Sequence, residues 1–354
     1  MSDIKFRESI STLQSHTIGN DGDESVVTFW ARIVIVSYNS GEDLQTCIDH
    51  LEKQSFQNFE VVVVDNNETE RVFPRLRLPN GRYSVLESER NIGFAGGSNL
   101  GARGSESDWI ITLNPDSWAE PDWLEKLFLA SQAYPDFSIL SSVVIQAKNP
   151  DRLDSFGDYF SIFGVARNAG AGMSVSAHPR EYCEVFCPTG AAAAYKCDVF
   201  HHSGGFDETF FCYLEDVDLG YRLRLFGEKC LQCPDAYIRH IGSSSTGAHS
   251  DFKYFYSYRN NVALILKNTP AILLCLMIPA FVLSQIWWIF RNRNNVGSSA
   301  RLSGLKAGIS QIPLLWKERR VIQNKRTVRA TEIAKKYSWT IRSVRTSQFV
   351  FWSI

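Results

Sequence analysis

Arg32-Ile-Val-Ile-Val-Ser-Tyr-Asn39 is the stretch of this 354-residue chain that decides its fold. Its four consecutive apolar β-formers, followed at once by a polar turn, predict a strand that is buried on both faces of a parallel sheet. Leu44, Ile48 and Leu51 then recur at helical spacing. A buried strand followed directly by an amphipathic helix is the first half of a β-α-β unit.

The same alternation continues along the chain. Glu60-Val-Val-Val-Val-Asp65 predicts a second buried strand, and further strands are expected at residues 83–86, 109–113 and 236–240. Residues 122–133 carry apolar side chains at helical spacing. This rhythm predicts an α/β fold, Rossmann-like, with a mostly parallel central sheet. In such sheets, ligands bind at the carboxyl ends of the strands.

Polar side chains stand at three predicted strand ends. They are the segments Ser37-Tyr38-Asn39, Asp65-Asn66-Asn67 and Asn114-Pro115-Asp116. Since the carboxyl ends of parallel strands lie at one edge, we expect these groups to converge there. The Gly-rich run Asn91-Ile-Gly-Phe-Ala-Gly-Gly-Ser-Asn99 does not fit the dinucleotide motif, and the sequence contains no P-loop motif.

Three acidic residues and one histidine could carry chemistry at this edge, and each has an ordinary structural alternative. Asp116 suits a divalent cation, yet Asn-Pro-Asp-Ser is also a common turn sequence. Asp65 could likewise be a turn residue at a strand end. Asp216, at the start of an expected helix, could be a general base or a helix cap. His240 by itself is more typical of a structural histidine.

Taken together, the order and spacing of these motifs resemble those of family-two inverting glycosyltransferases, and most of all the bacterial rhamnosyltransferase branch. The resemblance implies a GT-A fold and the transfer of a sugar from a nucleotide donor with inversion at the anomeric carbon. The matching segments are residues 33–39, 61–67, 91–99, 113–116, 189–191, 205–211 and 213–222.

The resemblance implies a role for each matched residue. Asp216 would be the general base, and Asp116 and His240 would bind a divalent cation, Mg²⁺ or Mn²⁺. Asn114 departs from the family pattern, in which many members carry Asp, so we expect weaker metal binding without its loss. The donor would be bound by Ser37, Tyr38, Asn39, Asp65, Asn67, Asn91, Gly93, Phe94, Asn99, Asn114 and Asp116.

The resemblance also implies the donor. We expect dTDP-L-rhamnose, with a UDP-sugar as the alternative. The expected acceptor is a saccharide, in particular a lipid-linked one, of a bacterial surface polysaccharide such as O-antigen in the cell envelope, because the apolar segment at residues 271–290 and its basic flank would bring the site to a membrane surface. The non-enzymatic alternative is a membrane protein that binds a nucleotide sugar without catalysing a reaction. The presence of Asp65, Asp116, Asp216 and His240 favours an enzyme.

A membrane-associated segment is expected near the C-terminus. Residues 271–290 are apolar except for Pro279, Ser284 and Gln285, and residues 291–354 carry 14 Lys and Arg against 2 Asp and Glu. An apolar segment with an internal proline and a basic flank favours a helix lying on an anionic membrane over one that spans it. The alternatives are a buried helix of an appended subdomain and a homo-oligomer contact; no nucleic-acid partner is expected.

These features divide the chain into three expected parts. Residues 1–28 are polar and predict a flexible tail. Residues 29–260 form the GT-A glycosyltransferase domain, and residues 261–354 form a helical, basic, membrane-associated region. This organisation places the protein at the cytoplasmic face of the plasma membrane, as a peripheral or monotopic protein.

Overall fold

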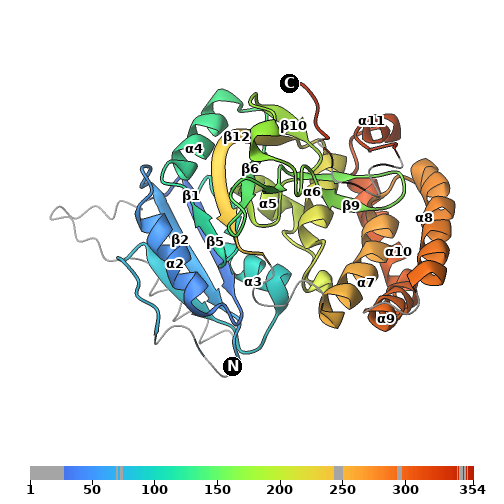
Figure 1. The fold of residues 1–354 in the computed structure, drawn as a ribbon, viewed down its shortest axis with the longest axis horizontal. Helices are drawn as coiled ribbons and strands as arrows, with labels where there is room; N and C mark the ends of the chain where they lie inside the picture. The colour runs from blue at the N-terminus through green and yellow to red at the C-terminus, as the bar shows by residue number, and fades with distance from the viewer. Residues whose placement is uncertain are drawn as a thin grey trace.

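A computed structural model describes residues 28–68, 71, 75–242, 250–292, 297–340, 342, 346, 348 and 350–354, excepting the side chains of residues 288–290 and 292. The expected tail at residues 1–28 lies outside the described residues, apart from residue 28. The chain forms an α/β body, and its last helices pack together on one side of that body (Figure 1).

The central sheet is built around the strand that the opening stretch predicts. That strand, β1 (Ala31–Ser37), pairs in parallel with β2 (Phe59–Asp65) and β4 (Trp109–Leu113), and β3 (Tyr83–Glu87) extends the parallel set beyond β2. On the other side of β4 the order continues with β11 (Ala192–Lys196), β6 (Ile139–Gln146), β12 (Cys230–His240) and β10 (Cys183–Val185). β11 is antiparallel to both its neighbours, whereas β12 runs parallel to β6. The predicted α/β fold with its mostly parallel central sheet is therefore confirmed.

Alternate residues of β1 belong to two different hydrophobic cores, which explains why its sequence is apolar without a break. Ile33 and Ile35 pack under one helical layer, and Val34 and Val36 pack under the other. The first layer comprises α2 (Gly41–Glu52) and α4 (Trp123–Ala133). The second comprises α3 (Gly93–Ala102), α5 (Cys197–Ser203) and α6 (Glu215–Phe226).

Several short strands stand beside the main sheet, and the sequence patterns did not predict them. β5 (Ser117–Ala119) pairs antiparallel with the end of β12, and β7 (Leu153–Ser155) pairs with β6. β8 (Asp158–Phe160) and β9 (Ala166–Asn168) form a separate hairpin. These pieces border the carboxyl edge of the sheet and supply part of the site described below.

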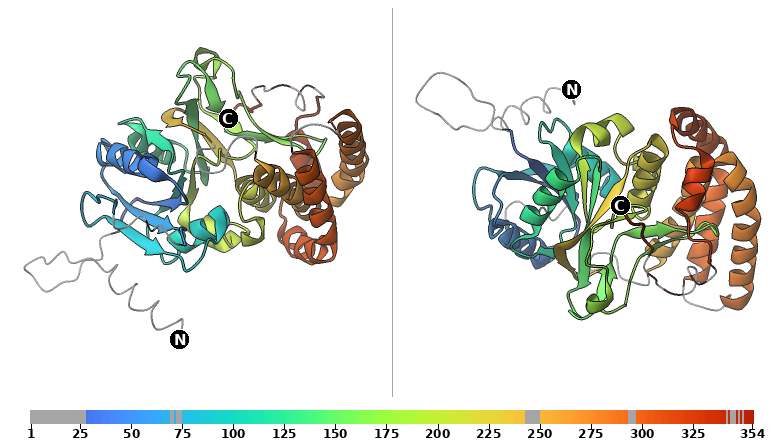
Figure 2. Two further views of the ribbon diagram at one scale, coloured as in Figure 1. Left: turned by 60° about the horizontal axis from the view of Figure 1, so that its bottom comes forward. Right: turned by 90° about the horizontal axis from the view of Figure 1, so that it is seen from above.

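The C-terminal helices share a hydrophobic core with the α/β body. They are α7 (Asp251–Asn268), α8 (Ala271–Asn292), α9 (Ser298–Ser310), α10 (Ile312–Lys325) and α11 (Ala330–Lys335), which gather on the side of the molecule away from β2 and β3 (Figures 1 and 2). Phe186 and Tyr221 of the body pack in one cluster with Leu264, Met277 and Leu315. The expected boundary after residue 260 falls inside α7. Within the described parts of the chain, no helix combines the length and apolar character needed to cross a bilayer.

Candidate active site

A cavity of about 1070 Å³ opens at the carboxyl ends of β1 and β4, between the sheet and α7. Most of the residues that the sequence assigns to the donor, the base and the metal line this cavity. They are Tyr38, Asn39, Asn91, Gly93, Phe94, Asn114, Asp116, Asp216 and His240. Ser37, Asp65, Asn67 and Asn99 do not line it, so their part in donor binding stays a prediction.

The turns after β1 and β2 are joined by side-chain hydrogen bonds. The Asp65 carboxylate is fully buried and accepts hydrogen bonds from the backbone N–H of Asn67 (3.0 Å) and from its side-chain amide (2.8 Å). The Asn67 side-chain oxygen in turn accepts from the N–H of Asn39 (2.9 Å), which has a φ of 51°. Asp65 and Asn67 thus hold the turn that presents Tyr38 and Asn39 to the cavity.

The Gly-rich run lies against the loop that follows Phe210, and glycine is required at position 93. Gly93 has a φ of 75°, and a Cβ built there would lie 2.3 Å from the carbonyl oxygen of Phe211. Its N–H donates to the side chain of Asn91 (2.9 Å). Asn99 uses its amide to bind the backbone of Phe206, away from the cavity lining.

Asp116 and His240 come together because β5 pairs with the end of β12, with His240 opposite Ser117. The His240 Nε2 atom lies 3.3 Å from Asp116 Oδ1, and Nδ1 lies 2.7 Å from Asp154 Oδ2. Asn114, the departure from the family pattern, places its amide 3.4 Å from the same Nε2 atom. The sequence offered no reason to single out Asp154, which lies on β7.

This arrangement suits a cation. Burial acts to lower the pKa of His240, but hydrogen bonds and charge interactions with Asp116 and Asp154 outweigh it and raise the pKa to about 9. The positive charge that the site favours could be supplied by an imidazolium or by a metal ion. Among the described residues no group of three or more His, Cys, Asp or Glu has metal-site geometry.

Asp216 lies in the first turn of α6 and faces Gly190. Its Oδ1 atom accepts a hydrogen bond from the N–H of Val217 (2.8 Å). A Cβ built on Gly190 would lie 2.1 Å from Asp216 Oδ2, so only glycine leaves room for the carboxylate at this position. Burial raises the pKa of Asp216, and hydrogen bonds from the N–H groups of Val217 and Gly190 offset part of this rise. A carboxylate with a raised pKa is a stronger base.

Two further carboxyl groups, Asp158 and Glu215, line the cavity. Burial raises the pKa of each well above its ordinary range, and the negative charge of Asp216 raises both further. A raised pKa favours the protonated carboxylic acid, and in that form Asp158 or Glu215 can donate a hydrogen bond to a substrate oxygen. Sequence reasoning missed Asp158 because it lies on the unexpected strand β8.

The loop before Asp216 has a strained backbone that α7 holds in place. Phe211, Tyr213 and Leu214 all have φ between 64° and 69°, a region that non-glycine residues rarely adopt. The Asn260 side-chain amide, which is 1% exposed, donates to the carbonyl oxygens of Phe210 (2.9 Å), Cys212 (2.9 Å) and Tyr213 (2.7 Å). Asn260 therefore fixes the loop that carries the predicted base, although it lies at the expected domain boundary and in no motif.

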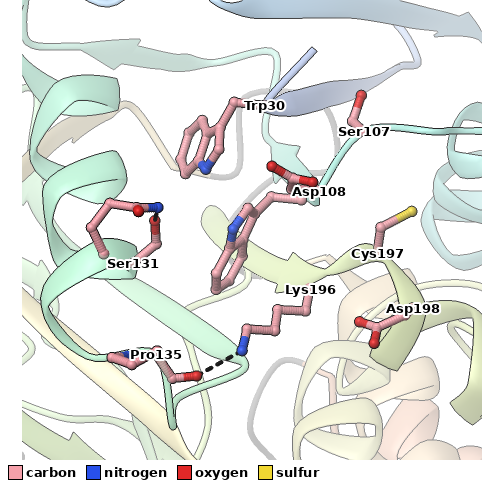
Figure 3. A pocket seen from close by; sticks show the side chains of 10 residues that line it. Trp30, Ser107, Asp108, Ser131, Pro135, Lys196, Cys197 and Asp198 are labelled. Atoms are coloured by element: carbon pink, nitrogen blue, oxygen red, sulfur yellow. Dashed lines mark hydrogen bonds between the residues drawn. The ribbon is translucent and has the colours of Figure 1, made fainter. Parts of the chain in front are cut away.

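A smaller cavity, of about 480 Å³, lies at the opposite edge of the sheet, beside Trp30 and Trp109 (Figure 3). Lys196 points across it and donates to the carbonyl oxygen of Pro135 (2.7 Å). This edge carries the amino ends of β1 and β4, where parallel sheets do not ordinarily bind ligands. The larger cavity is therefore the candidate active site.

Comparisons with known proteins show which proteins the chain is similar to. Residues 32–203 match the family model described as Glycosyl transferase family 2. An N-acetylglucosaminyl-diphospho-decaprenol L-rhamnosyltransferase of Mycobacterium tuberculosis is 27% identical over 246 residues, which cover 61% of this chain and 77% of that protein. The low-salt glycan biosynthesis hexosyltransferase Agl10 of Haloferax volcanii is 25% identical over 234 residues, covering 64% and 73%.

The fold is also found among solved structures. The crystal structure of GalNAc-T7 with UDP, GalNAc and Mn²⁺ superposes with a TM-score of 0.59 at 14% identity, covering 88% of this chain and 65% of that chain. At this identity the likeness shows the GT-A fold alone, and the chain spans slightly less than two thirds of that neighbour. The matched family model and the fold lead to one conclusion: residues 32–203 form a glycosyltransferase domain that is similar to those of family two.

Proposed function

We propose that the protein transfers L-rhamnose from dTDP-L-rhamnose to a lipid-linked saccharide, with inversion, in the synthesis of a bacterial surface polysaccharide. The single observation that carries the reaction is the Asp216 carboxylate, which lies against Gly190 in the same cavity as Asp116 and His240. The name of the mycobacterial relative supports the rhamnosyl donor and the lipid-linked acceptor.

In the proposed reaction Asp216 takes the proton of an acceptor hydroxyl. The acceptor oxygen forms a bond to the anomeric carbon while the bond from that carbon to the diphosphate oxygen breaks on the opposite face. Asp116 and His240 would hold a divalent cation, which when bound offsets the charge of the diphosphate. The loop held by Asn260 positions Asp216 in the cavity.

Donor hydrolysis with a panel of dTDP- and UDP-sugars tests the proposed donor. We expect dTDP-L-rhamnose to be turned over fastest, and faster turnover of a UDP-sugar would replace it. Asp216→Asn should reduce transfer to background while the dissociation constant of the donor changes less than about threefold, because the amide keeps the shape of the carboxylate but cannot accept the proton. Near-normal transfer by this variant would show that another group is the base.

Metal binding is tested apart from activity. Titration of the protein with Mn²⁺, followed by electron paramagnetic resonance, should show one site that is lost in His240→Ala. His178→Ala is a matched control, because His178 is buried but does not line the cavity. If His240→Ala binds Mn²⁺ as the wild type does, His240 is not a ligand.

The exposed face of α8 supports a location on the membrane surface. Ile272, Leu276, Leu283 and Trp287 are each more than half exposed on a helix whose other side packs in the protein core. An apolar stripe beside a basic segment is typical of helices that lie in the interface of an anionic membrane. Leu283→Glu should weaken sedimentation with anionic vesicles, whereas Leu129→Glu should not, since Leu129 is similarly exposed but lies on α4. Equal sedimentation of both variants would contradict membrane docking through α8.

A further inference from the structure

We propose that the part of the cavity between β9 and α7 binds the diphosphate group of a prenyl-diphosphate-linked saccharide acceptor, through Arg167 and Lys253. This acceptor site rests on the proposed glycosyl transfer and gives it a substrate class. Arg167 and Lys253 are the Arg and Lys side chains among the described residues that line the cavity. Neither takes part in the donor, metal or base roles described above.

α7 presents a polar stripe to the cavity. Lys253, Ser257 and Asn261 recur every four residues and all line it, so they share one face of the helix. The residues that lie elsewhere around the helix include Val262 and Leu264, which are buried in the core shared with the other C-terminal helices. A polar helix face directed into a cavity suits a polar ligand.

Lys253 occupies a position that local electrostatics disfavours. It lies in the first turn of α7, where the positive end of the helix dipole opposes a cation. Its ammonium group lies 5.7 Å from the ring centroid of Tyr213, which belongs to the loop before Asp216. An anionic ligand bound near this loop would compensate for the unfavourable interaction of the lysine with the helix dipole.

Arg167 is brought to the same helix by the β8–β9 hairpin. A Cβ built on Gly164, in the turn of the hairpin, would lie 2.6 Å from Ile265 of α7 and 3.4 Å from Phe281 of α8. This close approach fixes the hairpin against both helices. Arg167 lines the same cavity as Ser257 and Tyr258 of α7. Burial raises the pKa of the Tyr258 hydroxyl, and the positive charges of Arg301 and Arg167 offset part of this rise.

The remaining charge of the cavity makes these two cations necessary for an anionic acceptor. Besides His240, the other acidic or basic residues of the lining bear carboxyl groups: Asp116, Asp154, Asp158, Glu215 and Asp216. Asp158 and Glu215 favour the protonated, uncharged form, so the negative charge comes from the other three. A diphosphate near Asp216 would be repelled unless cations stand beside it, and a planar guanidinium and an ammonium group are the side chains that bind phosphate oxygens best.

In the proposed arrangement the saccharide reaches Asp216, and its diphosphate lies beside Arg167 and Lys253, which both line the cavity. Gln285 of α8 lines the same cavity, and it lies on a different face of that helix from the exposed Ile272 and Leu283.

Binding of two synthetic probes to the full chain tests this site. One probe is N-acetylglucosamine linked to farnesol through a diphosphate, and the other is the same saccharide linked to farnesol directly. By calorimetric titration the wild type should bind the diphosphate probe at least about tenfold more tightly. Arg167→Gln and Lys253→Gln should each lose most of that preference, and Lys253→Arg should keep it. Lys306→Gln, which removes an exposed charge on α9 outside the cavity lining, should leave it unchanged.

Three results would overturn the proposal. The first is a wild type that shows no preference for the diphosphate probe, and the second is a preference that both glutamine variants keep. The third is that the glutamine variants lose as much affinity for a nucleotide diphosphate as they lose for the diphosphate probe. This result would mean that Arg167 and Lys253 bind the donor. Donor hydrolysis by the wild type is measured separately, so absence of hydrolysis with every nucleotide sugar would count against the proposed function and not against the probe preference.

Discussion

Replacing Asn260 by alanine should impair catalysis far more than it impairs folding. The change removes an amide whose two N–H groups are shared among three carbonyl oxygens of the loop before Asp216, at 2.7 to 2.9 Å. At about 0.5–1.5 kcal/mol for each N–H group, the loss lowers the free energy of unfolding by about 1–3 kcal/mol. Phe211, Tyr213 and Leu214 have positive φ, and each such residue stores about 1–3 kcal/mol of strain. Without the amide this strain is released by loop movement, which displaces Asp216. A displacement of about 1 Å costs about a hundredfold in rate.

The assay compares urea unfolding with the kcat of donor hydrolysis or sugar transfer. Gln323→Ala is the matched control, because its amide donates to the carbonyl oxygens of Lys267 (3.2 Å) and Asn268 (2.9 Å) at the far end of the same helix. The control should lose about 1–2 kcal/mol of stability and keep kcat within about twofold. A folded Asn260→Ala protein with wild-type kcat would refute the idea that this amide positions the base.

Three further changes test other parts of the structure. Gly190→Ala should lower kcat about a hundredfold with little change in donor affinity, because its Cβ would displace the Asp216 carboxylate; unchanged kcat would mean that the carboxylate tolerates the methyl group. Burial raises the pKa of Asp216, and a base acts only when deprotonated, so kcat should fall as the pH drops through this raised pKa. An acid limb at the ordinary aspartate pKa of about 3.9 would contradict this. Lys267→Met should lower the free energy of unfolding by about 3–5 kcal/mol, since it removes the cation beside Asp207 and one of the two cations beside the buried Asp218, which keeps Arg222; a melting temperature within about 2 °C of the wild type would exclude that role.

Sequence patterns alone predict the parallel strands β1, β2, β3 and β4, the helices α2 and α4, and the edge at which the site lies. The apolar run before Asn39 and the run before Asp65 are local patterns, and burial on both faces of a parallel strand requires such patterns. Polar groups at strand ends then mark the binding edge, because all parallel strands end on the same side. Asp116 could be selected in this way, whereas the role expected for Asp216 came from the resemblance to the glycosyltransferase family.

The tertiary structure decided which groups surround those residues. His240 meets Asp116 only because β5 pairs with the end of β12, and Asp154 meets His240 through β7. Asn260 reaches the loop before Asp216 from a helix that the sequence assigned to the domain boundary. Contacts of this kind join segments that are far apart in the chain. The local periodicity of a sequence indicates which face of a helix or strand is buried, but it does not indicate which other element covers that face.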